Sequence, residues 1–226
     1  MKARGRPRTF DRQEALRKAM EVFWSRGYEH SSLSDLTVAM GINSPSLYAA
    51  FGNKEELFRE ALELYSKTEG GGIWSGVATA PTARIACEVL LRSTAEAFAQ
   101  DDRRRGCMIV LSAPQAEGST PSVCDDLSMR RRETTMLLEK RLERAVHEHE
   151  LQSGTDYGVI AAFIATVQHG MSIQARDGAS RERLLGIARC AMAAWESLMV
   201  MREYAPPPAS DHGEDGAAVP ARSRTE

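Results

Sequence analysis

The sequence predicts an all-α protein with an N-terminal helix-turn-helix domain of three helices and a larger C-terminal helical domain. Three observations support this fold class. Leu16, Ala19, Met20 and Phe23 recur at i, i+3, i+4 and i+7, which is the pattern of one buried helix face. A turn containing Gly41 separates two short helical segments. The 226 residues are 42% hydrophobic and 27% charged, as in an ordinary globular protein.

Composition and periodicity divide the chain into four parts: a basic arm (1–9), the helix-turn-helix domain (10–53), a helical regulatory and dimerisation domain (54–203) and a tail (204–226). The arm and the tail lack apolar residues for a core and are expected to be disordered without a partner. Helices are expected at 11–26, 34–40, 44–51, 53–69, 82–100, 107–116 with a bend at Pro114, 120–150, 155–175 and 181–201, with a linker near 69–81.

The short helix 44–51 is the centre of the N-terminal part. Gly41 can end the preceding helix in a positive φ conformation, and Asn43 or Ser44 can cap the next one. Leu47 and Phe51 lie four residues apart and can anchor the helix to a core. The remaining positions face outward: Ser44, Pro45, Ser46, Tyr48 and Ala49. Small and hydroxylic side chains there suit contact with DNA, although an ordinary helical hairpin has the same spacing.

The residues that decide between these readings extend over positions 10–65. They are Gly27-Tyr28, Leu36, Ala39, Gly41-Ile42, Ser46-Leu47-Tyr48, Phe51 and Lys54-Glu55-Glu56-Leu57. In this stretch the chain closely resembles the DNA-binding domain of the TetR/AcrR family of bacterial regulators. Ser44 departs from the family pattern, in which a basic residue is common. The resemblance implies a transcriptional regulator, more often a repressor, that a small-molecule effector releases from a double-stranded DNA operator.

Local charge agrees with DNA binding at one end of the chain. Residues 1–54 carry nine basic and five acidic side chains, a net charge of +4, whereas the rest of the chain carries −6. Arg4, Arg6 and Arg8 form an R-G-R-P-R stretch that suits a narrow A/T minor groove, although a solvated basic tail has the same composition. Lys54, in the first turn of its helix, is expected to contact a phosphate, and Ser32 is a further candidate for DNA contact.

Other function classes find little support. The sequence has no G-x-S-x-G, Walker or H-E-x-x-H motif, so no enzyme, cofactor or catalytic residue is predicted. The four cysteines form no C-x-x-C pair, and His147 and His149 point to different helix faces, so no metal site is predicted and 147–150 is expected to be a solvated helix end. An architectural DNA binder that uses only the arm would need no second core. Without a signal peptide or a membrane span, a cytoplasmic location is expected.

The last two long helices are apolar over more than one stripe, which indicates a second surface to be covered. A homodimer through a four-helix interface is therefore expected, in agreement with the family, whose members dimerise with their last two long helices. The predicted interface residues are Ile164, Met171, Leu184, Ala188, Ala191, Trp195 and Leu198.

An effector pocket is expected among the helices of the C-terminal domain, where apolar bulk mixes with a few polar groups. Its candidate residues are Trp74, Cys107, Met108, Gln115, Met136, Gln168 and His169. The alternative function is a thiol-based redox or electrophile sensor. Cys107 follows Arg103-Arg104-Arg105-Gly106 and begins an apolar segment, and nearby cations at a helix N-terminus lower a thiol pKa. On that hypothesis Cys107 is alkylated before the other three cysteines. The alternative is a buried structural cysteine, which the apolar run 108–111 beside it favours.

Overall fold

The computed structural model describes residues 10–99, 105–112 and 120–202, and within these ranges it confirms an all-α fold. The described part contains helices, turns and one isolated bridge between Thr155 and Arg202, with no strand. None of the helices found there has the length and apolar composition that crossing a membrane requires. Residues 1–9 and 204–226, for which disorder was expected, lie outside the described ranges.

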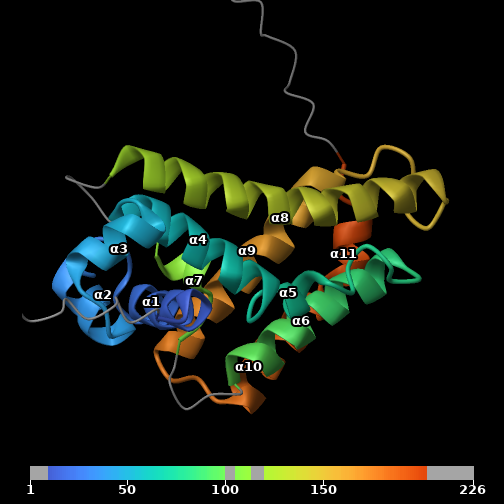
Figure 1. Ribbon diagram of the computed structural model, residues 1–226. Helices are drawn as coiled ribbons and strands as arrows, with labels where there is room; N and C mark the ends of the chain where they lie inside the picture. The colour runs from blue at the N-terminus through green and yellow to red at the C-terminus, as the bar shows by residue number, and fades with distance from the viewer. Residues whose placement is uncertain (1–9, 100–104, 113–119, 203–226) are drawn as a thin grey trace, which may run out of the picture.

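Three helices form the N-terminal head: α1 (Arg12–Arg26), α2 (Leu33–Met40) and α3 (Ser44–Phe51) (Figure 1). Each begins at a polar cap, which the sequence predicts for α3. The Asp11 carboxylate accepts from the amides of residues 13 and 14, Ser32 caps α2, and Asn43 accepts from the amide of Ser46 at 2.9 Å. Gly41 ends α2 in the left-handed region with φ 71°, where a Cβ would add strain.

Helix α4 (Lys54–Lys67) connects the head to the rest of the chain. Phe58 lies in the first half of α4, and its ring centroid is 5.0 Å from those of Phe23 and Tyr28 in the head. At its other end Tyr65 contacts Trp24, with ring centroids 5.0 Å apart. One continuous cluster of buried residues therefore extends from α1 through α4 into the C-terminal helices. A domain boundary at residue 54 remains a proposal.

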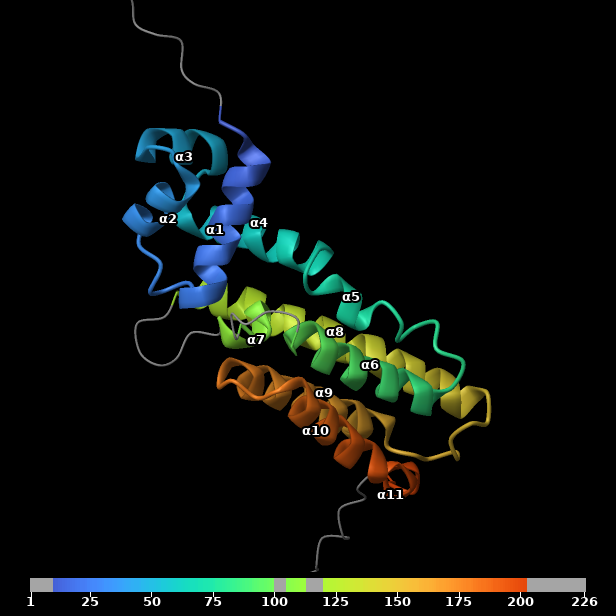
Figure 2. The same ribbon diagram turned by 90° about the horizontal axis from the view of Figure 1, so that it is seen from below.

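In the described residues after α4, seven further helices form the body, most of them side by side in Figure 2. They are α5 (Gly71–Trp74), α6 (Ala83–Ala99), α7 (Met108–Leu111), α8 (Pro121–His147), α9 (Tyr157–Arg176), α10 (Arg181–Ala193) and α11 (Trp195–Met199). Helix α6 packs against α8, α9 and α10, so it lies in the middle of the body. The short α7 contacts α1, α4, α8 and α9 and so lies between head and body.

Three expected elements differ from the structure. The linker near 69–81 contains the helical turn α5, because Ile73 and Val77 are buried in the core. The segment from Cys107 forms one turn, α7, and its expected bend at Pro114 lies outside the described residues. The helix expected at 181–201 is divided at Ala194, where ψ is −4° and the chain turns Trp195 into the core.

The end of α8 contains a buried ion pair that sequence reasoning missed. Arg141, whose side chain is 0% exposed, donates to the Glu150 carboxylate at 2.8 Å and to the Ala80 carbonyl at 3.2 Å. Glu150 also accepts from the Ala83 amide at 2.6 Å, at the start of α6. Glu150 therefore joins three segments of the body, and the expectation of a solvated end at 147–150 is wrong for this residue.

Candidate functional site

Helix α3 carries the residues that the sequence predicts to contact DNA. It lies at the end of the head farthest from α9 and α10 (Figure 2). Leu47 is fully buried and Phe51 is 3% exposed, so these two side chains fix the helix to the head. Tyr48 is 49% exposed. Ser44, Pro45 and Ala49 are also exposed, and Ser46 is half-buried. Each predicted α3 contact residue thus lies at or near the surface, and the N-terminal end of the helix is open to a partner.

Arg12 holds the other end of α3. Its guanidinium donates to the Ala50 carbonyl at 3.1 Å and to the Glu60 carboxylate at 2.7 Å, and it lies 4.4 Å from the centroid of the Phe51 ring. A cation at the last carbonyls of a helix also offsets the negative end of the helix dipole. Arg12 therefore joins α1, α3 and α4, a role that the sequence-level charge count did not reveal.

The other cations of the described head are also engaged. Arg17 and Lys18 pair with Glu14, at 2.9 and 3.7 Å, and Arg26 pairs with Asp35 at 2.6 Å. Over the described residues 10–54, Lys54 is the one basic side chain without such an ion pair. The positive charge available to a partner in this part of the chain is consequently smaller than the net charge of the sequence indicates. Arg4, Arg6 and Arg8 lie outside the described residues.

Lys54 is held at the surface by an aromatic ring. Its ammonium nitrogen lies 4.2 Å from the centroid of Tyr28, a residue that is 7% exposed. Partial burial lowers the pKa of Lys54, partly offset by the charge of Glu29. The Tyr28 ring thus orients a cation beside the N-terminus of α4, and in the described residues this cation forms no ion pair within 4 Å.

Ser32 serves the fold of the head. Its hydroxyl accepts from the Asp35 amide at 3.0 Å, and the Ser32 amide donates to the Asp35 carboxylate at 3.1 Å, which completes a capping box. The hydroxyl also donates to that carboxylate at 2.6 Å. The hydrogen bond from Ser32, followed by that from Arg26, lowers the pKa of Asp35 to about 2. Ser32 remains exposed, but its hydroxyl is already bonded at the start of α2.

A cavity of about 140 Å³ lies between α4, α5, α7, α8 and α9. It is lined by Tyr65, Ser66, Gly70, Gly71, Ile73, Trp74, Cys107, Ile109, Thr134 and Gln168. Most of this lining is apolar, and the Tyr65 hydroxyl, the Cys107 thiol, Thr134 and the Gln168 amide add polar groups. Three of the predicted pocket residues, Trp74, Cys107 and Gln168, are brought together here.

The other predicted pocket residues lie elsewhere. Met108 is fully buried in the core, and Met136 is 48% exposed on a separate hollow of α8. His169 does not line the cavity, and Gln115 lies outside the described residues. Tyr65 was missed because it belongs to the apolar stripe of α4, and such a stripe does not show which member borders an empty space.

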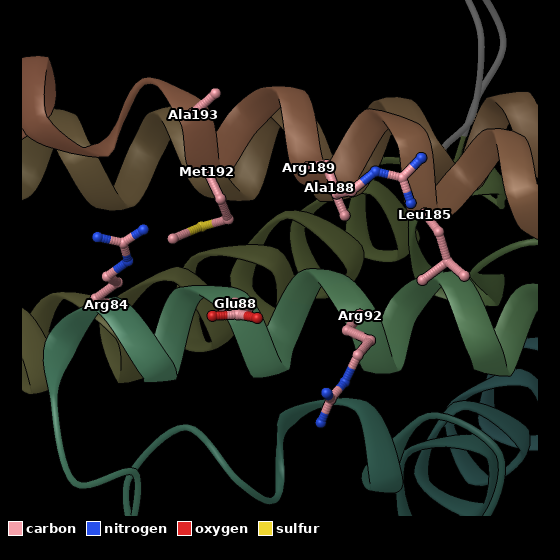
Figure 3. A pocket seen from close by; sticks show the side chains of 8 residues that line it. All are labelled: Arg84, Glu88, Arg92, Leu185, Ala188, Arg189, Met192 and Ala193. Atoms are coloured by element: carbon pink, nitrogen blue, oxygen red, sulfur yellow. The ribbon is translucent and has the colours of Figure 1, made fainter.

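A larger hollow of about 460 Å³ lies between α6 and α10 (Figure 3). Figure 3 shows Met192 between the two helices, while Arg84, Arg92 and Arg189 lie around the rim and point in different directions. Arg84 also pairs with Glu196 at 3.3 Å. Because these polar groups do not converge on one point, the smaller cavity is the better candidate for a ligand.

Cys107 has a different environment from the one expected. It is buried, and burial raises the pKa of its thiol, although a hydrogen bond from Tyr65 acts in the opposite direction. Arg105 lies over the Trp24 ring at 4.9 Å, and Arg103 and Arg104 lie outside the described residues. The prediction of a lowered thiol pKa is therefore wrong, since desolvation outweighs the nearby charges.

Alkylation rates should follow this burial. With limiting iodoacetamide in the native protein, Cys124, which is half-buried, is expected to react at least about tenfold faster than Cys107 or Cys87. Both slow thiols are buried, and burial raises the pKa of Cys87 to about 12. Peptide mass spectrometry over a time course measures the order. Labelling of Cys107 ahead of Cys124 would contradict the buried environment of Cys107 and would support the lowered thiol pKa that the sequence predicts.

A row of exposed apolar side chains runs along α9. Val159, Phe163 and Ile173 are 47%, 36% and 49% exposed, and they lie on one face at spacings of four and ten residues. Of the predicted dimer residues, Ile164 and Met171 lie on a different stripe of α9, and the other five lie on α10 and α11. Six of the seven are at most 7% exposed within one protomer, and Leu198 is half-buried: Ile164, Met171, Leu184, Ala188, Ala191, Trp195 and Leu198. Most of these side chains pack in the protomer's own core, and their part in a dimer interface stays a prediction.

No group of three or more potential metal-binding side chains comes together in the part of the chain that the structure describes.

Comparisons with known proteins agree with this architecture. Residues 15–61 match the family profile described as "Bacterial regulatory proteins, tetR family". The HTH-type transcriptional repressor ComR of Escherichia coli (strain K12) is 33% identical over 207 residues, covering 88% of this chain and 95% of ComR. BdcR, a repressor of the same organism, is 30% identical over 196 residues, covering 86% and 94%. A cysteine mutant of the regulator CifR, complexed with 26bp double-strand operator DNA, has 46% identity and a TM-score of 0.79, covering 84% of this chain and 100% of that one.

Proposed function

The chain belongs to the TetR family of bacterial regulatory proteins, and on that basis we propose that it is a homodimeric transcriptional repressor whose operator binding is relieved by a small molecule. The observation that carries the DNA-binding half is the geometry of α3. Its N-terminal end is exposed while Leu47, Phe51 and Arg12 hold it to the head. The cysteine mutant of CifR, whose structure matches 84% of this chain, is complexed with operator DNA.

Two copies of α3 would enter successive major grooves, about 34–36 Å apart along the duplex. Ser44, Pro45, Ser46 and Ala49 would face base edges, because they surround the open end of the helix. Lys54 and the Tyr48 hydroxyl would contact phosphates and fix the register. The arginines of the arm would add minor-groove contacts, as the sequence suggests.

The dimer would use the exposed row on α9, with α10 beside it. A face that carries Val159, Phe163 and Ile173 is costly to leave in water, and a two-fold axis would cover it with its own copy. Pairing through α9 would place one head on each side of the axis. A dimer is also what a two-groove contact requires, since a single α3 reads one half-site.

The effector would enter the cavity that Tyr65, Trp74, Cys107 and Gln168 line. About 140 Å³ accommodates a small, largely apolar molecule with one or two hydrogen-bonding groups. The cavity borders α4, which contacts the head, so an occupant can act on the DNA-binding surface. The Cys107 alternative is favoured by one observation, that its thiol lines this cavity. An electrophile whose shape fits the cavity would be held beside the Cys107 thiol. This proximity, rather than a lowered thiol pKa, would promote its reaction with Cys107.

The first experiment selects bound sequences from a random duplex library with the full-length protein and measures their affinity by fluorescence anisotropy. We expect a two-fold symmetric site and at least about a thousandfold preference over random DNA at physiological salt. A metabolite panel screened by thermal shift and by release of the labelled site then identifies the effector. Sequence-independent binding would contradict the repressor assignment and favour an architectural DNA binder.

Replacing Lys54 tests the backbone contact. Lys54→Met keeps an unbranched chain over Tyr28 and removes the charge, and it should weaken binding to specific and random duplexes by a similar factor. The slope of log K against log salt should fall by about one unit, because one phosphate contact is lost. Arg17→Met is the matched control, since Arg17 is already paired with Glu14 and Glu21. A changed sequence preference in the Lys54 variant would assign the residue to base recognition instead.

A further inference from the structure

Between the cavity and the head, Gly106 lies where α1, α7 and α9 meet, and it is buried. Its carbonyl accepts from the indole Nε1 of Trp24 at 2.9 Å, at the last turn of α1. On its other side, the next amide, that of Cys107, donates to the Ser172 hydroxyl of α9 at 2.7 Å. A single peptide group, with its carbonyl on Gly106 and its amide on Cys107, thus joins a helix of the head to the helix that carries the exposed apolar row.

The backbone at Gly106 is packed so closely that no larger residue fits there. Its φ is 61°, and a Cβ there would lie 2.4 Å from the Ser172 carbonyl oxygen. The backbone is therefore packed directly against α9. A displacement of this segment would be transmitted to the indole of Trp24 rather than absorbed by loose packing.

Trp24 is also connected to the cavity by a second route. Its ring packs edge-to-face with that of Tyr65, and Cys107 follows Gly106 directly in the chain. Tyr65 and Cys107 both line the cavity, so an occupant would touch the two groups that hold Trp24 in place. The other direct bonds between head and body lack this property: Arg176 donates to the Ser25 carbonyl at 3.0 Å and the Thr120 amide donates to Glu29 at 3.0 Å, and none of these residues lines the cavity.

We infer that Trp24 is the residue through which occupancy of the cavity is coupled to the orientation of the head. This inference rests on the proposed function, and it assigns the regulation of DNA binding to the hydrogen bond from Trp24 to Gly106. An occupant that displaces Tyr65 or the Gly106–Cys107 segment pulls the end of α1 with it. Because α1 packs against both α2 and α4, the recognition helix α3 moves with the head.

A side chain placed in the cavity can act as the occupant while the effector is unidentified. Thr134 lines the cavity from α8, and Thr134→Phe would put a benzene-sized ring into the space. A ring of that size fits an apolar cavity of about 150 Å³. In the full-length protein, Thr134→Phe should raise the dissociation constant for the selected operator at least about tenfold.

The coupling test repeats this substitution in two backgrounds. Trp24→Phe keeps a ring against Tyr65 and removes the indole donor, so Thr134→Phe should then raise the dissociation constant about threefold or less. Arg176→Ala removes a bond from the body to the same turn of α1 and should preserve the tenfold effect. Thermal unfolding verifies that every variant is folded at the assay temperature.

The outcomes separate the two proposals. An equal loss of affinity in the wild-type and Trp24→Phe backgrounds overturns Trp24 as the coupling residue and leaves ligand release intact. No loss in the wild-type background overturns release by cavity occupancy itself, and this inference with it. If the Trp24→Phe protein does not fold, the test uses ¹⁹F NMR of fluorotryptophan-labelled protein with and without Thr134→Phe instead. Thr134→Phe should shift the Trp24 resonance and leave that of Trp195 in place, and an unmoved Trp24 resonance overturns the inference.

Discussion

Phe163→Glu should convert the protein to a monomer and lower its affinity for the selected operator by at least about 100-fold. Phe163 lies in the middle of the exposed row on α9, so a charge there would be buried without a partner in the dimer. The protomer should remain folded, because this side chain is 36% exposed within it. Loss of the second half-site contact removes the avidity that linked binding provides. Analytical ultracentrifugation gives the mass, and anisotropy gives the affinity.

Met129→Glu is the matched control. Met129 is 46% exposed on α8, away from the proposed interface, so its substitution should leave the dimer and the operator affinity unchanged. Trp195, which is 4% exposed, illustrates the opposite case: a charge at that position should unfold the protomer rather than separate intact subunits. A Phe163→Glu protein that still sediments as a dimer would place the interface elsewhere.

Glu150→Ala should cost a large part of the stability while leaving the protein folded. Removing this carboxylate leaves the Arg141 guanidinium buried with its charge uncompensated, which should cost about 3 kcal/mol. For a chain of this size, that corresponds to a fall in Tm of roughly 6–12 °C. Glu148→Ala, two residues away, removes an exposed partner of Arg144 at 3.6 Å and should change stability by less than about 0.5 kcal/mol. Equal melting temperatures for the two variants would contradict a buried pair.

The same pair predicts a pH dependence. Burial by itself would raise the pKa of Glu150, but hydrogen bonds from the Ala83 amide and Arg141, with the charges of Arg141 and Arg144, lower it below the ordinary value of 4.5. The folded state therefore binds this proton less readily than the unfolded state. The contribution is complete above about pH 4.5 and is lost as the pH falls through the lower folded-state value. Denaturant melts at several pH values should show wild type and Glu150→Gln converging on the acidic side.

Much of the head could be predicted from the sequence because its determinants are local. Capping residues and a glycine with positive φ act within one helical turn, so Asn43, Asn53 and Gly41 are readable without knowledge of the fold. The exposed positions of α3 followed from the buried pair Leu47 and Phe51. The same reasoning did not reveal Arg12 as a brace, since its acceptors lie 38 and 48 residues away in the chain.

The body was less readable because its determinants are tertiary. Apolar residues on two sides of a helix predict that both sides are covered. The pattern does not show which side packs in the protomer's core and which side would pack against a second subunit. Ile164 and Phe163 are adjacent in the sequence, and only packing shows that Ile164 is buried and Phe163 exposed. The division at Ala194 occurs in an alanine-containing stretch without glycine or proline, so no breaker indicates it. The cavity and the raised pKa of Cys107 likewise depend on several helices at once.

The brace formed by Arg12 bears on how new operators could be acquired. It bonds the main chain of Ala50 and the ring of Phe51, and the side chains that hold α3 do not include Ser44, Pro45, Ser46 or Ala49. The outward residues can therefore be exchanged while the helix keeps its position and the head keeps its core. On the contacts proposed above, stability and DNA readout are assigned to separate residues of one eight-residue helix. We therefore expect that such a head could be retargeted by changing four positions, without compensating substitutions inside the protein.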